Sequence, residues 1–377
     1  MTLPAPQSAA PQSTPARPER RPIRVMIVDD SLVIRGVISR ILKGLAGIEV
    51  VASVSNGMLA IERARKRDID VVVLDIEMPV LDGISALPRL MEVDRSLVVI
   101  MASTLTSRNA DISIQALSLG ASDYIPKPTA VGEIGGASDF AKELVEKVTA
   151  LGNRRIGRRE PAATPAAQGA IPTRLHAPAG WRPKVLAIGS STGGPQALLR
   201  FLSHLTRANL KNGLDVPVFI TQHMPPKFTE FLASHLAKET GLPCIEARDG
   251  DIAQRGSVYI APGDHHLVVT REGPAVVMHL NQEAKENYCR PSVDPMLKSL
   301  AQAYGDRILA VILTGMGSDG HRGCEDVVRT GGAVLAQDEA TSVVWGMPGA
   351  VARAGLCRAV LPLDDLARHV AGLVGQR

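Results

Sequence analysis

The chain has 377 residues, more than one ordinary domain contains and a comfortable length for two. With 45% hydrophobic and 21% charged residues it cannot be wholly disordered, and with only 3% aromatic residues its cores must depend on Ala, Val, Leu and Ile. The net charge of +4, from 42 basic and 38 acidic residues, is too small to indicate a nucleic-acid partner. No apolar run approaches the roughly 18 residues of a membrane-spanning helix, so we expect no membrane insertion.

The start of the chain and the cysteines point to an intracellular protein. Residues 1–22 contain six prolines and lack the apolar segment of a secretion signal, which predicts a disordered tail. The four cysteines, Cys244, Cys289, Cys324 and Cys357, lie far apart and form no C-x-x-C pair. This spacing favours free thiols in a reducing cytoplasm over zinc ligands or disulfides.

Strand and helix patterns alternate in residues 23–150. The expected strands are 23–28, 49–54, 70–74, 97–102 and 123–125, and the expected helices are 31–43, 57–66, 83–92, 109–119 and 138–150. Such alternation predicts an α/β domain with a doubly wound, mostly parallel sheet, whose binding chemistry lies at the carboxyl ends of the strands.

The composition changes after residue 150. Residues 151–183 contain a cluster of arginines followed by an Ala/Pro/Gly-rich run, and we interpret them as a solvated interdomain linker. The alternation resumes in residues 184–377, which predict a second α/β domain with a mostly parallel sheet and some antiparallel pairing. The strands expected there are 184–188, 216–221, 257–261, 267–270, 275–280, 308–314 and 333–336.

Acidic residues follow two strands of the first domain. Asp29 and Asp30 come after the first strand and Asp75 after the third, so three carboxylates should converge at one edge of the sheet. Oxygen ligands of this kind select Mg²⁺. Ser103 and Lys127 follow the fourth and fifth strands and add a hydroxyl and a positive charge. This set suits phosphoryl transfer onto Asp75; the alternative is that the aspartates only cap the helices that follow them.

These residues carry a family resemblance over about residues 24–150. Asp29-Asp30, the run Leu74-Asp75-Ile76-Glu77-Met78-Pro79 with Asp82-Gly83, Ser103 and Lys127-Pro128 resemble the receiver domain of bacterial response regulators. The resemblance implies that Asp75 accepts a phosphoryl group from a histidine kinase, with Mg²⁺ held by Asp30, Asp75 and a main-chain carbonyl. It also implies that Ser103 and Tyr124 form the switch that reports phosphorylation.

Three strand ends of the second domain carry the residues of a possible nucleophilic site. Ser191 lies in a G-x-S-x-G turn between a strand and a helix, although such turns also bind phosphate or serve as plain turns. His223 follows the next apolar strand and could act as its base. Asp319 follows a later strand and could orient His223, while main-chain N–H groups near Met316 could bind an oxyanion.

The turn around Asp319 allows a competing interpretation. Residues 315–320 form a literal G-x-G-x-x-G, and Asp338 lies about 20 residues further on, as in dinucleotide-binding folds. The motif comes late in its domain, however, and places Asp319 where a pyrophosphate would approach. The order Ser, His, Asp also differs from that of α/β-hydrolases.

A second resemblance covers about residue 183 to the C-terminus. It rests on Ile188-Gly189-Ser190-Ser191-Thr192-Gly193-Gly194-Pro195, Gln222-His223-Met224-Pro225, Tyr259-Ile260-Ala261-Pro262-Gly263, Arg290-Pro291-Ser292-Val293-Asp294 and Leu313-Thr314-Gly315-Met316-Gly317-Ser318-Asp319-Gly320. These segments resemble the catalytic domain of the chemotaxis protein-glutamate methylesterase family. Ser190 stands where the family commonly has Ala, but the register of the following Thr-Gly-Gly favours Ser191 as the nucleophile.

The resemblance implies a cytoplasmic enzyme of chemotaxis adaptation. It would hydrolyse glutamate γ-methyl esters on the cytoplasmic helices of chemoreceptors, releasing methanol, and deamidate receptor glutamines. It would use Ser191, His223 and Asp319 without a cofactor and be activated by phosphorylation of Asp75. Two other classes stay open at this point: a regulator whose second domain only binds DNA or a partner, and a nucleotide-binding oxidoreductase.

Overall fold

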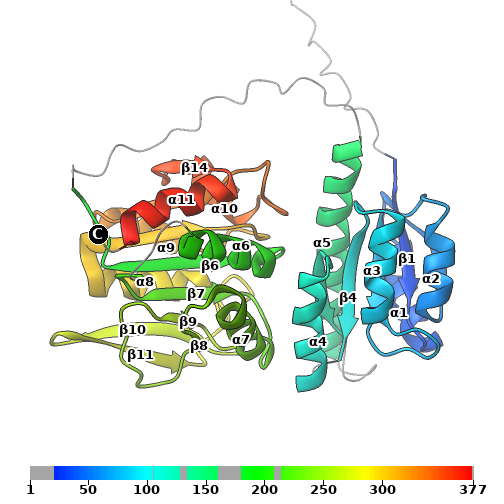
Figure 1. The fold of residues 1–377 in the computed structure, drawn as a ribbon, viewed down its shortest axis with the longest axis horizontal. Coiled ribbons are helices and arrows are strands. Elements are labelled where there is room, and N and C mark those ends of the chain that lie inside the picture. The colour runs from blue at the N-terminus through cyan, green and yellow to red at the C-terminus, as the bar shows by residue number, and fades with distance from the viewer. Residues whose placement is uncertain (1–20, 105, 128–133, 160–179, 208–213, 376–377) are drawn as a thin grey trace, which may run out of the picture.

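The computed structural model describes residues 21–104, 106–127, 134–159, 180–207 and 214–375 (Figure 1). The expected N-terminal tail lies outside these ranges except for its last two residues, as does most of the expected linker. Within the described part of the chain, no helix combines the length and apolar character needed to cross a bilayer.

The N-terminal domain is a five-stranded sheet in the order β2-β1-β3-β4-β5 with all neighbours parallel, which confirms the expected topology. Its strands are β1 (Ile23–Val28), β2 (Ile48–Val54), β3 (Val71–Asp75), β4 (Val98–Ser103) and β5 (Asp123–Pro126). Its helices are α1 (Leu32–Lys43), α2 (Gly57–Ala64), α3 (Gly83–Val93), α4 (Ser107–Ser118) and α5 (Ile134–Arg159).

Local sequence explains where these elements begin and end. All residues of β3 are buried, as expected for a central parallel strand covered on both faces. Side chains cap the helices that follow the strand ends: Ser31 accepts a hydrogen bond from Ile34 N, and Asp82 accepts one from Ser85 N at 2.7 Å. The β-to-α turns at the acidic edge are thereby held in place.

Helix α5 continues nine residues into the segment interpreted as linker. Leu151 and Ile156 are buried, and Arg155 is only 3% exposed because it donates to Asp94 Oδ2 at 2.6 Å. A side chain at Gly152 would collide with Ile23. This glycine therefore does not end the helix but allows α5 to pack closely against β1. The solvated-linker interpretation is therefore wrong for these residues.

The C-terminal domain is a seven-stranded parallel sheet in the order β14-β13-β12-β6-β7-β9-β8, with the antiparallel pair β10-β11 beside it. Its strands are β6 (Val185–Ser190), β7 (Val218–Gln222), β8 (Cys244–Glu246), β9 (Val258–Ile260), β10 (His266–Glu272), β11 (Ala275–Asn281), β12 (Ile308–Ile312), β13 (Ala333–Gln337) and β14 (Ala359–Leu361). Its helices are α6 (Gly194–Arg207), α7 (Phe228–Thr240), α8 (Val293–Tyr304), the 3₁₀ turn η1 (Gly305–Arg307), α9 (His321–Arg329), α10 (Met347–Arg353) and α11 (Leu363–Val374). The expected strands and the antiparallel pair are present, and the short edge strands β8 and β14 were not foreseen.

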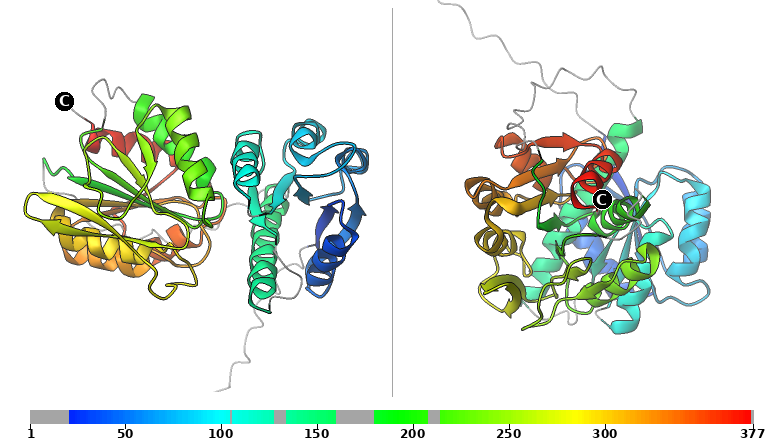
Figure 2. Two further views of the ribbon diagram at one scale, coloured as in Figure 1. Left: turned by 90° about the horizontal axis from the view of Figure 1, so that it is seen from below. Right: turned by 60° about the vertical axis from the view of Figure 1, so that its left-hand side comes forward.

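Helices cover both faces of this sheet (Figures 1 and 2). Alternate residues of β6 separate the two cores: Leu186 and Ile188 join the cluster of α6, α7 and α11, and Val185 and Ala187 join that of α8, α9 and α10. Strand β6 pairs with β7 on one side and β12 on the other. The strand order reverses at β6, and in open α/β sheets ligands bind in a crevice outside the carboxyl ends of the strands at such a point. The crevice expected in this domain is therefore at the carboxyl ends of β6, β7 and β12.

The two domains meet where α4 of the first domain packs against α6 and α7 of the second (Figure 1). The ring of Tyr124 stacks on that of Phe228, with centroids 4.7 Å apart. Gln196 Nε2 donates to Ala121 O at 2.7 Å. Helices α6 and α7 directly follow the carboxyl ends of β6 and β7, so the first domain packs against the elements that border this edge of the second sheet.

Candidate functional site

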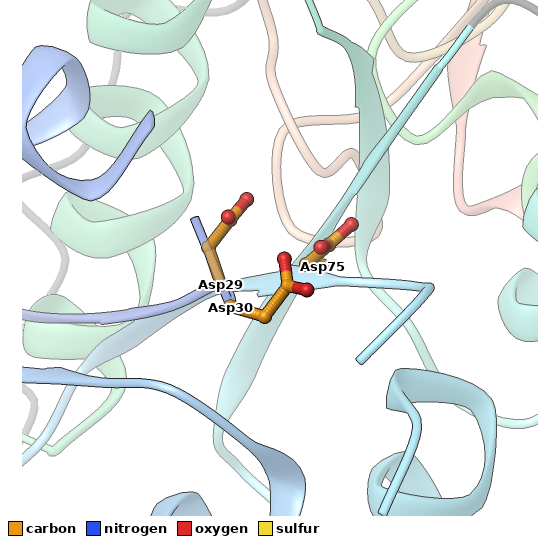
Figure 3. A group of neighbouring side chains, drawn as sticks. All are labelled: Asp29, Asp30 and Asp75. Carbon is orange, nitrogen blue, oxygen red and sulfur yellow. The ribbon is translucent and has the colours of Figure 1, made fainter. Parts of the chain in front are cut away.

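Three carboxylates converge at the carboxyl edge of the first sheet, as expected. Oxygens of Asp29, Asp30 and Asp75 lie within 4.8 Å of one another at the ends of β1 and β3 (Figure 3). Asp29 and Asp75 are buried, and Asp30 is exposed. Lys127 Nζ lies 2.6 Å from Asp29 Oδ2 and 2.6 Å from Asp75 Oδ1. The first, third and fifth strands therefore bring their polar residues to one point.

The electrostatics of this point suit a cation. Burial raises the pKa of Asp75 to about 6, against the lowering effect of Lys127 and with a further increase from Asp29. One lysine thus compensates incompletely for three carboxylates. Clustered carboxylate oxygens are the donor set that Mg²⁺ prefers, so the residues present fit this ion. A pocket of about 420 Å³, lined by Asp30, Glu77 and Arg108 among others, opens beside them.

The two expected switch residues contact neighbours outside the carboxylate cluster. Ser103 is buried, and its hydroxyl lies 3.0 Å from that of Ser113 on α4. Tyr124 is buried between Phe228 and Lys147, whose Nζ lies 4.9 Å from the centre of its ring. Ser113 and Lys147 were not singled out from the sequence, because each is an ordinary polar residue within a helical pattern.

Ser190 and Ser191 have different environments. Ser190 is the last residue of β6, is fully buried, and donates its hydroxyl to Gln222 Oε1 at 2.7 Å. Ser191 is the first residue beyond the strand and is partly exposed, and its hydroxyl makes no hydrogen bond to another described residue. The hydroxyl that is available at the crevice is therefore that of Ser191.

His223 and Asp319 come together at the neighbouring strand ends. His223 follows β7, Asp319 follows β12, and His223 Nε2 lies 2.7 Å from Asp319 Oδ2. With Nε2 donating to the carboxylate, the neutral imidazole has its lone pair on Nδ1. Within the described part of the chain no hydrogen bond joins Nδ1 to the Ser191 hydroxyl. His223 N donates to Ser190 O at 3.2 Å, however, so His223 and Ser191 lie at the same edge of the sheet.

Asp319 is held by an extensive hydrogen-bond network. It is 2% exposed, and besides His223 it accepts from Asn287 Nδ2 at 2.8 Å, Ser292 Oγ at 2.8 Å and Val293 N at 2.7 Å. Burial raises its pKa, but the hydrogen bond to His223 and these further donors lower it on balance, so Asp319 stays ionised. Asn287 was missed in the sequence, because its loop has no motif that points to Asp319.

Cys289 is a second residue that the sequence did not assign to the site. Its Sγ lies 3.5 Å from His223 Nδ1. Burial lowers the pKa of His223, whereas the electrostatic interaction with the Cys289 side chain and then the hydrogen bond to Asp319 raise it, with a net result of about 10. The protonation state of His223 is therefore governed by both of its neighbours.

The glycine-rich turn before Asp319 does not resemble an open nucleotide site. The Asp319 carboxylate itself accepts from Gly320 N at 2.8 Å, where a pyrophosphate would bind the start of α9. Met316 N makes no hydrogen bond to another residue that the structure describes, and Met316 is partly exposed. The turn thus offers a free N–H at the crevice rather than a dinucleotide cradle.

A carboxylate cluster with a lysine in one domain and a histidine–aspartate pair in the other are arrangements expected in one class of protein, the response regulators whose output domain is an enzyme. The family model of the response regulator receiver domain matches residues 25–137, and that of the CheB methylesterase matches residues 186–370.

Relatives match nearly the whole chain. A protein-glutamate methylesterase/protein-glutamine glutaminase 1 of Paramagnetospirillum magneticum is 51% identical over 373 residues, 94% of this chain and 97% of the relative. A protein of the same description from Azospirillum brasilense is 52% identical over 367 residues, 93% of this chain and 92% of the relative. The crystal structure of the Thermotoga maritima CheB methylesterase catalytic domain has 41% identity and a TM-score of 0.48, covering 51% of this chain and 99% of that domain. The two relatives show that the chain belongs to the protein-glutamate methylesterase/protein-glutamine glutaminase family.

Proposed function

We propose that this chain hydrolyses glutamate γ-methyl esters and deamidates glutamines on chemoreceptor helices, with Ser191 as nucleophile, His223 as base and Asp319 as the residue that orients His223. The observation that carries the assignment is the convergence of these residues at the crevice between β6, β7 and β12, with Asp319 bound to His223 at 2.7 Å. The relatives of this family support the reaction, and the crevice supports the residues.

The proposed reaction is acyl transfer in two halves. Ser191 Oγ attacks the ester carbonyl carbon while its proton passes to His223 Nδ1, and the carbonyl oxygen becomes an oxyanion next to the free Met316 N–H. Collapse expels methanol, which takes the proton from His223 and leaves an acyl-enzyme. Water, deprotonated by His223, then hydrolyses the acyl group to glutamate and restores Ser191. With a glutamine side chain, ammonia replaces methanol as the leaving group.

Substrate binding must bring Ser191 and His223 closer together, since His223 Nδ1 faces Cys289 and makes no hydrogen bond to Ser191. Catalytic hydrogen bonds are often long before substrate binds. Asp319 stabilises the imidazolium that forms when Ser191 loses its proton.

The first domain supplies the control. Asp75 would accept a phosphoryl group from a histidine kinase, and Asp29, Asp30 and Asp75 would hold Mg²⁺, which neutralises the incoming phosphoryl oxygens. Lys127, already 2.6 Å from Asp75 Oδ1, would pair with the new phosphoryl charge. Breaking its present bonds to Asp29 and Asp75 is the local electrostatic change that starts the switch.

Activation would follow from release of the domain contact. Ser103 connects the phosphoacceptor edge to α4 through Ser113, and Tyr124 connects it to Phe228 on α7. Helices α6 and α7 begin just after Ser191 and His223, so the receiver in this position limits access to the crevice. We propose that phosphorylation favours a separated arrangement, and that the protein acts in the cytoplasm, where receptor helices and kinase are present.

The first experiment is methanol release from a methylated chemoreceptor fragment by the full chain, the Ser191→Ala variant and the Ser190→Ala variant. Release by the wild type and by Ser190→Ala, with a loss of about 10⁶-fold in Ser191→Ala, is the expected result. Full release by Ser191→Ala would overturn the assignment of the nucleophile. No release by any of the proteins, with a phosphodonor and Mg²⁺ present, would overturn the proposed reaction.

A further inference from the structure

A tight loop carries contacts to both partners of the proposed His223–Asp319 pair. Asn287 Nδ2 donates to Asp319 Oδ1 at 2.8 Å, and Cys289 Sγ lies 3.5 Å from His223 Nδ1. Tyr288 stands between these two residues, and at 84% exposure its ring points away from the protein core. A large aromatic side chain is therefore presented directly beside the catalytic crevice.

The loop has an unusual backbone conformation at Tyr288, and hydrogen bonds hold it in place. Asn287 and Tyr288 have φ values of +51° and +64°, a left-handed conformation that bulky residues rarely adopt. Cys289 N donates to Glu286 O at 2.9 Å and closes the turn. Next to it, Arg290 donates to Asp264 Oδ1 at 2.7 Å and fixes the base of the loop. Backbone strain retained at such a point is typical of functional positions.

The face of the Tyr288 ring is used by the other domain. Lys142 of α5 places its Nζ 4.1 Å from the centroid of the ring, which is a cation–π contact between the receiver and the crevice loop. Lys142 is itself exposed, so this contact is made at the edge of the domain contact and not within a core. An incoming molecule must displace Lys142 to reach the same face of the ring.

We propose that Tyr288 is a substrate-docking residue for the receptor helix, and that the closed receiver occupies the same ring with Lys142. The inference rests on the proposed function, since it requires Ser191, His223 and Asp319 to form the active site. Receiver and substrate then compete for one aromatic surface.

The geometry of the substrate supports this role. A glutamyl ester projects from a helix of about 10 Å diameter, so its helix must rest on the protein surface around the crevice while the side chain reaches Ser191. Tyrosine supplies a large contact area with few rotatable bonds, and exposed aromatic residues dominate the energetics of such contacts. Tyr288 is exposed and adjacent in sequence to Asn287 and Cys289, which contact Asp319 and His223, so its ring belongs to the surface beside the crevice.

The test uses the full chain with acetyl phosphate and Mg²⁺, and measures methanol release over a range of concentrations of a methylated receptor fragment. For Tyr288→Ala we expect KM to rise about 10-fold with kcat within about 2-fold of wild type, because the variant loses a contact that binds the receptor helix but keeps every catalytic residue. Tyr288→Phe, which keeps the ring, should behave as wild type.

A small ester distinguishes docking from a structural role. Hydrolysis of p-nitrophenyl acetate needs the catalytic residues but no helix, so Tyr288→Ala should leave its kcat/KM unchanged. A parallel fall in activity on both substrates would show that Tyr288 only holds the loop and would overturn the proposal. A Tyr288→Phe variant as weak as Tyr288→Ala would overturn it as well. Activity of Ser191→Ala on both substrates would instead contradict the proposed function.

Competition is tested without a phosphodonor. Lys142→Met should raise basal methanol release about 2- to 5-fold, the range expected for loss of one exposed cation–π contact. The matched control is Arg271→Met, which removes the guanidinium that lies 5.2 Å from the Tyr304 ring within the second domain and should leave basal release unchanged. Equal basal release by Lys142→Met and wild type would overturn the competition between receiver and substrate.

Discussion

Replacement of Asp319 by Asn tests the proposed catalytic pair most directly, because the substitution keeps the shape of the side chain. The carboxylate offers two oxygens: Oδ1 accepts from Asn287, Ser292 and Gly320 N, and Oδ2 accepts from Val293 N and faces His223 Nε2. An amide has only one oxygen. If that oxygen keeps the Oδ1 partners, the new NH₂ group points at Val293 N–H and at His223 Nε2.

Two effects follow from this geometry. His223 must then accept at Nε2, which places its proton on Nδ1 and removes the lone pair that would receive the Ser191 proton. Loss of the correct tautomer in a triad lowers kcat by about 10⁴-fold. In addition, a buried Val293 N–H without an acceptor costs about 1–3 kcal/mol of folding free energy.

The assay is methanol release by Asp319→Asn beside urea unfolding of the same protein. Asp294→Asn is the matched control: Asp294 accepts from Gly323 N at 2.7 Å in the same buried cluster and has no hydrogen bond to His223. We expect Asp294→Asn to change stability while its kcat stays within about 10-fold of wild type. An Asp319→Asn enzyme whose kcat is equally close to wild type would refute the assignment of Asp319.

Three further outcomes are expected. Asp75→Asn should keep basal methanol release and lose activation by acetyl phosphate, and full activation of this variant would contradict Asp75 as the acceptor. The electrostatic interaction with the Cys289 side chain raises the pKa of His223, and the base must be neutral. Cys289→Ser should therefore lower that pKa and move the rising limb of the pH–kcat/KM profile to lower pH; an unchanged or higher limb would refute the coupling. Gln196→Ala removes the 2.7 Å hydrogen bond between the domains, which is worth about 0.5–1.5 kcal/mol. Methanol release by the unphosphorylated protein should therefore rise about 2- to 12-fold, whereas slower release would show that the domain contact does not inhibit the enzyme.

The residues of the two candidate sites were predictable where they directly follow buried strands. In a parallel sheet the carboxyl ends of all strands share one edge, so Asp75 and Lys127 had to approach each other once the strands were identified. The same reasoning placed His223 next to Asp319, although 96 residues separate them. Short apolar runs ending in polar residues carried this information without any alignment.

The preference for Ser191 over Ser190, which followed from the family resemblance, has its physical reason in the strand register. Side chains alternate between the two faces of a strand, and β6 ends with Ser190 directed at Gln222, which leaves Ser191 beyond the strand and available. Arg155 shows the reverse error: a cluster of arginines resembles a solvated linker until the acidic partner Asp94, distant in sequence, is known. In both cases the deciding neighbour lies on another element.

The sequence by itself determined the two α/β domains, the family and the residues at the strand ends, because hydrophobic periodicity and strand-end motifs are local properties of the chain. Only the tertiary structure decided that Asn287 and Cys289 contact Asp319 and His223 and that Lys142 lies over the ring of Tyr288. These contacts join a loop to strand ends or one domain to the other. No local pattern encodes them, since each depends on how separately folded elements pack together.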